Sequence, residues 1–350
     1  MVIAVCVYSG IEPMLKLERT LKRMGHIVNT FYTDHYHVNS PYCMKKLDKC
    51  GIHRFRYKYE KKWKTQFLAY IDETKPDLII YVNAPTAVIH PLDMDEISDH
   101  CKATKTKQVV WFVDTIFERD DLTAYYPHFD KIYVYEKQDV LFLRDNYNLE
   151  GEYVPVGFND AYANTPVNKE KTYKYDVVFV GELHNRRVRL LNEVKKASLH
   201  YGWKLKVIMP WYEKRYFYKN ILLWLKYPKL VNAMDKRFID SSDVAHLYAQ
   251  SKIGLNIHNE RAKSCNPRTF EIMATGTFCL IDSRDDYDDI VVGRDLDAYM
   301  FDDAADCIEK IKLYLADDAV RERIARNGRS LVEKQYSMET SLRKIIGQEQ

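Results

Sequence analysis

Short apolar runs alternate with amphipathic segments along most of the chain. This alternation is typical of parallel sheets, whose strands are buried on both faces and joined by helices. In the first half we predict strands at Val2–Tyr8, Ile27–Thr33, Asp77–Asn83, Gln108–Asp114, Lys131–Tyr135 and Tyr153–Val156. In the second half we predict them at Asp176–Gly181, Leu205–Met209, Ile253–His258, Thr277–Asp282 and Tyr299–Phe301. The expected fold class is therefore α/β.

The two series of runs predict two doubly wound, Rossmann-like domains. Residues 159–174 between them are polar, contain Pro166 and have no periodicity, so we expect a linker there. The predicted domains are 1–158 and 175–335, with a terminal segment, 336–350, that packs back toward the first domain. Ligands of such folds bind beyond the carboxyl ends of the strands. We therefore expect the active site in a cleft between the domains.

Composition excludes several classes of protein. The formal net charge of +3 across 350 residues indicates no particular partner. The N-terminus lacks a secretory signal pattern, and no apolar stretch is long enough to cross a membrane. The seven cysteines form no Cys-x-x-Cys pair, so we expect reduced thiols and a cytoplasmic protein. The absence of Gly-x-Gly-x-x-Gly after the first strand and of a Walker motif argues against nicotinamide and P-loop chemistry.

The segment from Ser264 to Asp282 is the most informative part of the chain. Asn266 and Pro267 are a good helix start, and the free N–H groups of such a start can bind an anion. Arg268, in the first turn, can hold a diphosphate with two bonds, and Glu271 can accept hydrogen bonds from a ribose diol. An ordinary helix start with a solvent-facing arginine explains the same residues equally well.

The segment resembles the donor-site signature of glycosyltransferases with the GT-B fold, two Rossmann-like domains facing across a cleft. It is especially similar to the CgeB-like (spore maturation protein) family, with its Ser/Asn-x-Arg-x-Phe-Glu pattern followed by Ala-x-Gly and an apolar strand. A similar Arg-x-x-Glu helix occurs in the beta-glucosyltransferase that modifies T-even phage DNA. The resemblance implies that Arg268 binds the donor diphosphate and Glu271 the ribose, with Asn266 and Thr269 beside them.

The same resemblance implies a nucleotide-sugar donor, for which we expect a UDP-sugar, and no required cofactor. Mg²⁺ is expected at most to stimulate the reaction, because Asp93-x-Asp95 and Asp286-x-Asp288 lie in acidic loop contexts and not after a buried strand. Retaining relatives place a second Glu eight residues before Glu271, where this chain has Lys263. This departure favours inversion at the anomeric carbon.

Further donor contacts are predicted where the strand at Asp176–Gly181 ends. Gly181 allows close approach of a ligand to the backbone, and Asn185 can cap the next helix. Arg187 shares a stripe with apolar residues and should lean inward, whereas Arg186 and Arg189 point more outward. The resemblance implies a phosphate-binding arginine here, and Arg186 and Arg187 are the candidates. Solvent-facing arginines are the alternative.

Asn256 and His258 alternate in phase on the strand Ile253–His258, so they share one face. His258 is predicted to reach the donor, and a satisfied pair in the core is equally compatible with the sequence.

Asp114 ends an apolar strand in the first half and is the predicted general base. An inverting transfer needs a carboxylate or histidine to take the proton of the acceptor hydroxyl, and the T-even phage enzyme has its base at a similar strand end. Capping of the following segment is the alternative role. Ser9 and Gly10, after the first strand, resemble the loop that approaches the transferred sugar. The histidines His35, His37 and His90 are weaker alternatives as base.

Two segments combine cationic and aromatic residues, Lys45–Lys64 and Trp211–Tyr227. Such surfaces suit double-stranded DNA, and equally an anionic membrane that carries a lipid-linked saccharide. A solvated basic face over core aromatics is as compatible. The acceptor is therefore left open between a hydroxymethylated base in phage DNA and a cell-surface or spore glycan, and a non-catalytic nucleotide-sugar or nucleic-acid binding protein is a third reading.

Overall fold

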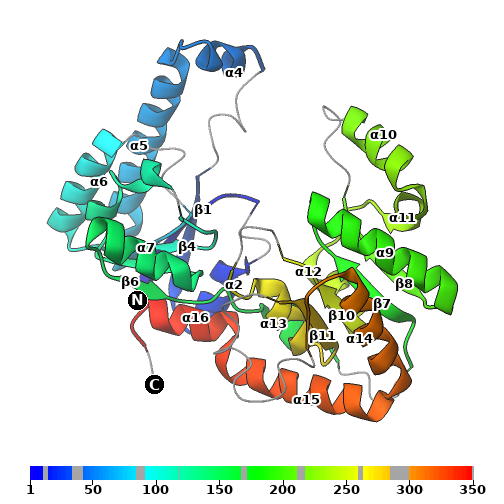
Figure 1. The fold of residues 1–350 in the computed structure, drawn as a ribbon. Helices are drawn as coiled ribbons and strands as arrows, with labels where there is room; N and C mark the ends of the chain where they lie inside the picture. The colour runs from blue at the N-terminus through cyan, green and yellow to red at the C-terminus, as the bar shows by residue number, and fades with distance from the viewer. Residues whose placement is uncertain are drawn as a thin grey trace. The chain divides into compact units, whose positions relative to one another are not determined.

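The computed structural model describes residues 1–10, 15–33, 42–83, 91–117, 119–166, 172–210, 217–258, 263–283 and 299–348. The chain divides into two compact units, Met1–Val156 with Met338–Gln350, and Gly157–Ser337. Each unit contains one six-stranded sheet, and every strand pair is parallel. The helices of each unit cover its own sheet (Figure 1). No helix in the described ranges is long and apolar enough to span a membrane.

The first unit has the strand order β2-β1-β3-β4-β5-β6. Its strands are β1 (Val2–Val7), β2 (Ile27–Tyr32), β3 (Leu78–Val82), β4 (Lys107–Phe112), β5 (Lys131–Val134) and β6 (Gly151–Tyr153). Its helices are α2 (Leu17–Arg23), α4 (Tyr42–Lys49), α5 (Arg54–Thr74), α6 (Pro91–Thr104), α7 (Lys137–Tyr147) and α16 (Met338–Ile345), with short 3-10 turns at Asp120–Leu122 and Tyr126–His128.

Both faces of this sheet are buried because the side chains of its central strands alternate between two apolar layers. Ala4 and Cys6 of β1 face one layer, and Ile3, Val5 and Val7 face the other. Helix α16 completes the second layer. It packs against α2, where Arg23 and Glu339 form an ion pair of 2.9 Å, and the Ser341 hydroxyl donates to the Pro155 carbonyl.

The second unit has the strand order β12-β11-β10-β7-β8-β9. Its strands are β7 (Tyr175–Val180), β8 (Leu205–Ile208), β9 (Met234–Asp235), β10 (Ser251–Asn256), β11 (Phe278–Asp282) and β12 (Met300–Phe301). Its helices are α8 (Asp160–Ala163), α9 (Asn185–Tyr201), α10 (Phe217–Lys226), α11 (Pro228–Ala233), α12 (Ser241–Ala249), α13 (Pro267–Ala274), α14 (Ala304–Ala316) and α15 (Asp318–Gln335).

Part of the segment expected as a linker is ordered as α8. The Asn159 side chain caps this helix by accepting from the Ala161 N–H at 2.9 Å, and Tyr162 is buried in the core of the second unit. A polar sequence can therefore form a short helix here because one side chain caps it and one aromatic ring anchors it.

Candidate functional site

The order of the second sheet places a topological switch point between β7 and β10, since the chain proceeds to opposite sides from these neighbours. Open parallel sheets bind ligands at this point, beyond the carboxyl ends of the strands. Gly181 follows β7 and His258 follows β10, and helices α9 and α13 begin at the same edge. The residues predicted to bind the donor thus come from four segments that meet there.

Arg187, in the first turn of α9, is 6% exposed and is held by backbone carbonyls. Its Nε donates to the Ile257 carbonyl at 2.7 Å, and its Nη1 donates to the Glu182 carbonyl at 3.2 Å. A Cβ added at Gly181 would lie 3.5 Å from the same Nη1. The side chain of Arg187 points inward, as expected. Its hydrogen-bond partners are neutral carbonyls, and no carboxylate among the described residues forms an ion pair with it.

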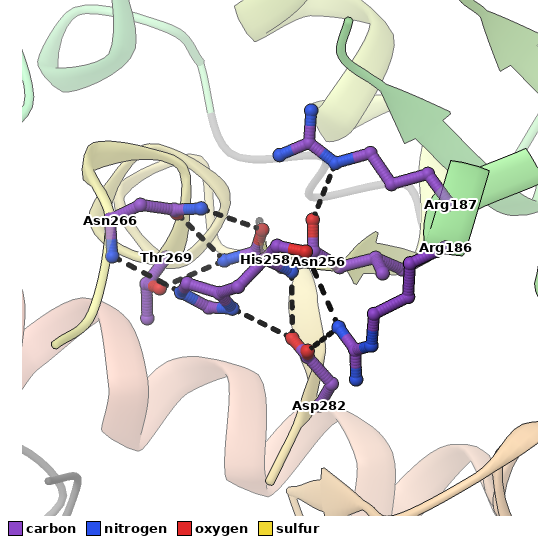
Figure 2. Close-up of polar contacts among 8 residues, drawn as sticks. Arg186, Arg187, Asn256, His258, Asn266, Thr269 and Asp282 are labelled. Atoms are coloured by element: carbon purple, nitrogen blue, oxygen red, sulfur yellow. Dashed lines mark hydrogen bonds and ion pairs between the residues drawn. The ribbon is translucent and has the colours of Figure 1, made fainter. Parts of the chain in front are cut away.

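Arg186 lies differently from the expectation that it points outward. It forms an ion pair with Asp282, the last residue of β11, and its Nη1 also donates to the His258 carbonyl at 3.3 Å (Figure 2). The reason is that Asp282 is completely buried and lies within reach of this side chain. Asp282 is not among the predicted site residues. It could have been found by the same signal as Asp114, because each is a carboxylate at the end of an apolar strand.

Asp282 also holds His258 in one tautomer. The backbone N–H of His258 donates to Asp282 Oδ1 at 2.9 Å, and the ring Nδ1 contacts the same oxygen at 2.7 Å. The other ring nitrogen, Nε2, accepts from the backbone N–H of Asn266 at 3.2 Å. Because Nε2 accepts this hydrogen bond, Nδ1 carries the proton that is donated to Asp282. Both ring nitrogens are used within the protein, so we assign His258 a positioning role at the start of α13.

Burial alone would raise the pKa of the Asp282 carboxyl. The hydrogen bonds from His258 and the charge of Arg186 outweigh this effect and lower its pKa below the usual range. The carboxylate is therefore charged and satisfied, and it fixes the ends of β10 and β11 relative to α9.

The start of α13 is held to β10 by amides and a hydroxyl. The Asn256 amide donates to Asn266 Oδ1 and to Thr269 Oγ1, both at 2.9 Å, and Asn256 and Thr269 are completely buried (Figure 2). Asn266 occupies the N-cap position of α13 but makes no side-chain capping bond, because its side chain pairs with Asn256. The expected Asn185 cap is also absent, since α9 begins at Asn185 and His184 is its N-cap residue.

Arg268 and Glu271 are partly exposed residues of α13. Across the described parts of the chain, no direct ion pair neutralises the Arg268 guanidinium. Burial raises the pKa of Glu271, while the Arg268 charge and a hydrogen bond from the Tyr162 hydroxyl act in the opposite direction. Tyr162 comes from α8, so the segment expected as a linker contributes to the neighbourhood of Glu271.

The electrostatics of this edge favour an anion. Burial and the positive charge of Arg268 lower the pKa of Arg187 to about 10, and the charges of Glu182 and Asp282 offset this only in part. Two guanidiniums from different helices are thus close enough to repel each other. An anion bound between them would relieve this repulsion and receive charge-assisted hydrogen bonds.

In the first unit, Asp114 follows β4 and lies at the carboxyl end of its sheet. The Asn83 amide donates to Asp114 Oδ2 at 2.6 Å, and Asn83 Oδ1 accepts from the Val113 N–H at 2.8 Å. Asn83 follows β3 and has a φ of 52°, a conformation that asparagine tolerates better than most residues. The carboxylate is therefore oriented by a neighbouring strand end.

A second carboxylate supports the same loop. Asp139, near the start of α7, is completely buried and accepts from the Thr115 hydroxyl at 2.9 Å and the Ile116 N–H at 3.0 Å. Burial raises the pKa of Asp139 to about 6, despite these two hydrogen bonds. Sequence reasoning did not identify Asp139, which lies inside a helix and carries no strand-end signal.

The remaining predicted residues have simpler surroundings. Ser9 and Gly10 form an exposed turn after β1, and a Cβ at Gly10 would meet no atom within 4 Å. The expectation that Asp93 and Asp95 lie in a loop is wrong, since both lie on helix α6, where Asp93 pairs with Lys64 at 2.7 Å and Asp95 is 3.8 Å from His128. His35, His37, His90, Asp286 and Asp288 lie outside the described residues.

Residues 186–347 match a protein-family model described as "Glycosyl transferase-like". The chain carries a glycosyltransferase domain. None of the curated protein sequences matches it. Many solved structures do match in fold, over 99% of this chain in each case below.

A glycosyltransferase from Rickettsia africae ESF-5 has a TM-score of 0.66 and 16% identity, with 97% of its chain covered. A mutant of the phage T4 beta-glucosyltransferase in complex with UDP-glucose has a TM-score of 0.57 and 14% identity, with 97% covered. An alpha-glucosyltransferase in complex with UDP and a 13-mer DNA containing an HMU base has a TM-score of 0.67 and 12% identity, with 98% covered.

At these identities the likeness shows the fold, and the predicted α/β GT-B fold of this glycosyltransferase is confirmed. The narrower similarity to the CgeB-like family stays a prediction, as do the individual site residues and the domain limits.

Proposed function

We propose that this glycosyltransferase transfers a sugar from a nucleoside diphosphate sugar, a UDP-sugar, to an acceptor hydroxyl with inversion. The observation that carries the proposal is the pair of arginines at the switch point of the second sheet. Arg187 is oriented by two carbonyls, Arg268 has no direct ion pair among the described residues, and the positive charge of Arg268 helps to lower the pKa of Arg187. A diphosphate suits this pair because it presents several anionic oxygens at once.

The donor is proposed to contact α13 through its diphosphate and its ribose. Arg268 and Arg187 would bind the diphosphate, and the Glu271 carboxylate would accept hydrogen bonds from the ribose hydroxyls. The hydrogen bond from Tyr162 helps to keep Glu271 ionised, because it lowers the pKa that burial raises. Asn256, Asn266, Thr269 and His258 would position the start of α13, and Arg186 would act through Asp282 and not directly.

In the proposed reaction, the acceptor oxygen attacks the anomeric carbon from the side opposite the leaving group. The bond between that carbon and the diphosphate oxygen breaks, and the nucleoside diphosphate leaves with the electron pair. Asp114 takes the proton of the acceptor hydroxyl. Asn83 orients Asp114, and the arginines stabilise the charge that develops on the departing diphosphate. Ser9 and Gly10 are proposed to lie near the transferred sugar.

For the acceptor we propose a hydroxymethylated base in phage DNA. Support comes from the shared fold with the alpha-glucosyltransferase solved with modified DNA, and from exposed lysines on α5, Lys58, Lys61 and Lys62. A base inside a duplex would have to be flipped out of the stack. A cell-surface or lipid-linked glycan is the second candidate, because α10 exposes an apolar and basic surface that DNA would not require.

A donor screen followed by an acceptor assay tests the proposal. Nucleotides and nucleotide sugars would be tested for a shift in melting temperature, and the donor that binds would be tested for hydrolysis and for turnover on hydroxymethylated DNA. UDP and a UDP-sugar should bind, and hydrolysis should fall sharply in Glu271→Ala but not in Glu193→Ala, an α9 carboxylate that pairs with Lys196. Binding without hydrolysis under any condition would instead support a non-catalytic protein.

A further inference from the structure

Helix α10 turns its apolar side chains toward solvent. Six large apolar side chains of this ten-residue helix are 45–63% exposed: Phe217, Tyr218, Ile221, Leu222, Trp224 and Leu225. By contrast, the polar side chain of Asn220 is buried, and only Leu223 packs against the core of the second unit. Amphipathic helices of globular proteins normally show the opposite arrangement.

The exposed side chains form one continuous face. With about 100° of rotation per residue, they cover an arc of about 160°, and Asn220 and Leu223 point to the other side. Helix α10 contacts α11, and both lie at the margin of their unit (Figure 1). Trp224 belongs to this face and donates from its indole to Asn232 at 3.1 Å, so its ring is held in a fixed position.

Exposed lysines follow one border of this apolar face. Lys219 and Lys226 are exposed and lie along its border by helical position, and Lys229, Lys236 and Arg237 follow within the next residues. Asp235 is the sole acidic residue between 217 and 239, and it already pairs with Lys206 and Arg237. The surface is therefore positive and apolar together.

The other basic and aromatic helix, α5, shows what an ordinary core helix does with the same composition. Trp63 and Phe67 are buried and stack at 4.8 Å, Arg56 pairs with Glu60, and Lys64 pairs with Asp93 and Glu96. The aromatic rings of α5 thus belong to the core and some of its cations are neutralised. Those of α10 are not covered by the unit to which they belong.

We propose that α10 lies on an anionic lipid bilayer, with its apolar face among the acyl chains and its lysines at the headgroups. Phosphate-rich nucleic acid would account for the lysines and the aromatic rings, but not for Ile221, Leu222 and Leu225, which can neither stack on bases nor form hydrogen bonds. A bilayer accounts for all of them, since apolar side chains enter the interface and lysines bind anionic lipids. This inference does not depend on the transfer reaction.

Vesicle flotation of the full chain tests the proposal. The vesicles would be phosphatidylcholine alone, or phosphatidylcholine mixed with an equal amount of phosphatidylglycerol. The protein should float with the mixed vesicles, and Leu222→Ser with Leu225→Ser should weaken partitioning by roughly tenfold or more, because two buried aliphatic side chains are lost. The matched control is Leu199→Ser with Leu313→Ser, two residues of similar exposure on α9 and α14, and it should float normally.

Two further variants separate the apolar and the electrostatic contributions. Lys219→Glu with Lys226→Glu should abolish the preference for mixed vesicles over phosphatidylcholine. Adding vesicles should shift the tryptophan fluorescence to the blue, because Trp224 enters the bilayer. Trp224→Phe should lose this shift, since the four other tryptophans of the chain are expected to stay outside the bilayer. Donor hydrolysis by the Leu222→Ser, Leu225→Ser variant should match that of the wild type. The test of membrane binding is therefore independent of the test of the proposed transfer reaction.

Three results would overturn the proposal. The first is absence of flotation with both vesicle types, and the second is flotation that the Leu222→Ser, Leu225→Ser variant does not weaken. The third is a different occupant of the same face. This would be shown by a wild-type dimer that dissociates in the Leu222→Ser, Leu225→Ser variant, or by binding of unmodified duplex DNA that the same variant weakens by roughly tenfold or more.

Discussion

The carboxyl ends of the two sheets each have a completely buried aspartate, and the two have opposite pKa shifts. Asp282, in the second unit, contacts a charged arginine and a histidine, and its pKa is lowered. Asp139, in the first unit, contacts a hydroxyl and a backbone N–H, and its pKa is raised to about 6. Burial is the same, so the charge of the neighbours decides the shift.

This difference extends to the whole of each edge. The edge of the second sheet gathers Arg186, Arg187 and Arg268, and its buried carboxylate is neutralised by one of them. The edge of the first sheet gathers two carboxylates, Asp114, which Asn83 orients, and the buried Asp139. We therefore expect the second edge to bind an anion and the first to accept a proton, which is the division of roles that an inverting sugar transfer needs.

The largest expected effect is at Asp114, the predicted base of the first edge. Asp114→Asn should lower turnover by about 10²–10⁴-fold, because the amide cannot accept the acceptor proton, while donor affinity stays within about twofold. Steady-state kinetics and donor titration would measure the two quantities. Asp145→Asn, an exposed residue that pairs with Arg144, is the control and should leave turnover unchanged. Equal turnover of the Asp114 and Asp145 variants would remove Asp114 as the base.

Asp282→Ala should destabilise the protein by about 3 kcal/mol, measured as the free energy of unfolding in urea. Removing one partner from a buried charged network leaves the others without their hydrogen bonds. Asp235→Ala is a control from the same sheet, since Asp235 pairs with two partly or fully exposed cations and its loss should cost about 1 kcal/mol or less. Similar losses for both variants would contradict the role given to Asp282.

The two buried aspartates should also change the pH dependence of stability in opposite directions. The raised pKa of Asp139 means that the folded state binds more protons than the unfolded state between about pH 4 and pH 6. Asp139 therefore favours the folded state below about pH 4 and loses this effect as pH rises through about 6, a difference of up to about 3 kcal/mol.

The lowered pKa of Asp282 has the opposite sign, since its stabilisation is present above about pH 4 and is lost as pH falls further. Unfolding free energies of the wild type, Asp139→Asn and Asp282→Asn across this range would measure both. Relative to the wild type, Asp139→Asn should gain stability on raising the pH from 4 to 6, and Asp282→Asn should lose less than the wild type on acidification below 4. Parallel curves would contradict the contrast.

The smallest expected effect concerns the glycine beside Arg187. A Cβ at Gly181 would lie 3.0 Å from Phe179 Cζ, so Gly181→Ala should cost about 1 kcal/mol as the ring shifts. Gly10→Ala adds its Cβ to open space, and its effect on stability should be within about 0.5 kcal/mol of zero. Thermal unfolding would measure the stability change caused by each variant. Equal changes for Gly181→Ala and Gly10→Ala would show that Gly181 is not closely packed.

Much of the fold was predictable because buried parallel strands appear as apolar runs. Strands that break this rule were not predicted correctly. β9 comprises only Met234–Asp235 and has no run, and β6 lies at Gly151–Tyr153, before the expected Tyr153–Val156, since Val154 and Val156 are buried outside the strand. The alternating pattern reports burial, and it cannot distinguish a strand from a buried extended segment.

At the site, Arg187 and Arg268 were predictable from their positions in the first turns of helices, and Asp114 from its position at the end of a strand. The sequence could not show which polar residues pair with each other. His258 accepts from the Asn266 N–H, Asn256 binds both Asn266 and Thr269, and Arg186 binds Asp282. These pairs could not be predicted because contacts between distant segments depend on how the strands are ordered. Tyr162 was not predicted for the same reason, since its partner Glu271 is more than a hundred residues away.

The most direct test of the account is the affinity for UDP of Arg268→Ala compared with Arg189→Ala, measured by titration calorimetry. Arg268 belongs to the proposed diphosphate site, whereas Arg189 is an exposed residue on α9. Loss of a charge-assisted contact of about 1.5–3 kcal/mol should weaken binding about 10–150-fold in Arg268→Ala, with Arg189→Ala like the wild type. Equal affinities of the two variants for UDP would contradict the claim that this edge of the second sheet holds the donor diphosphate.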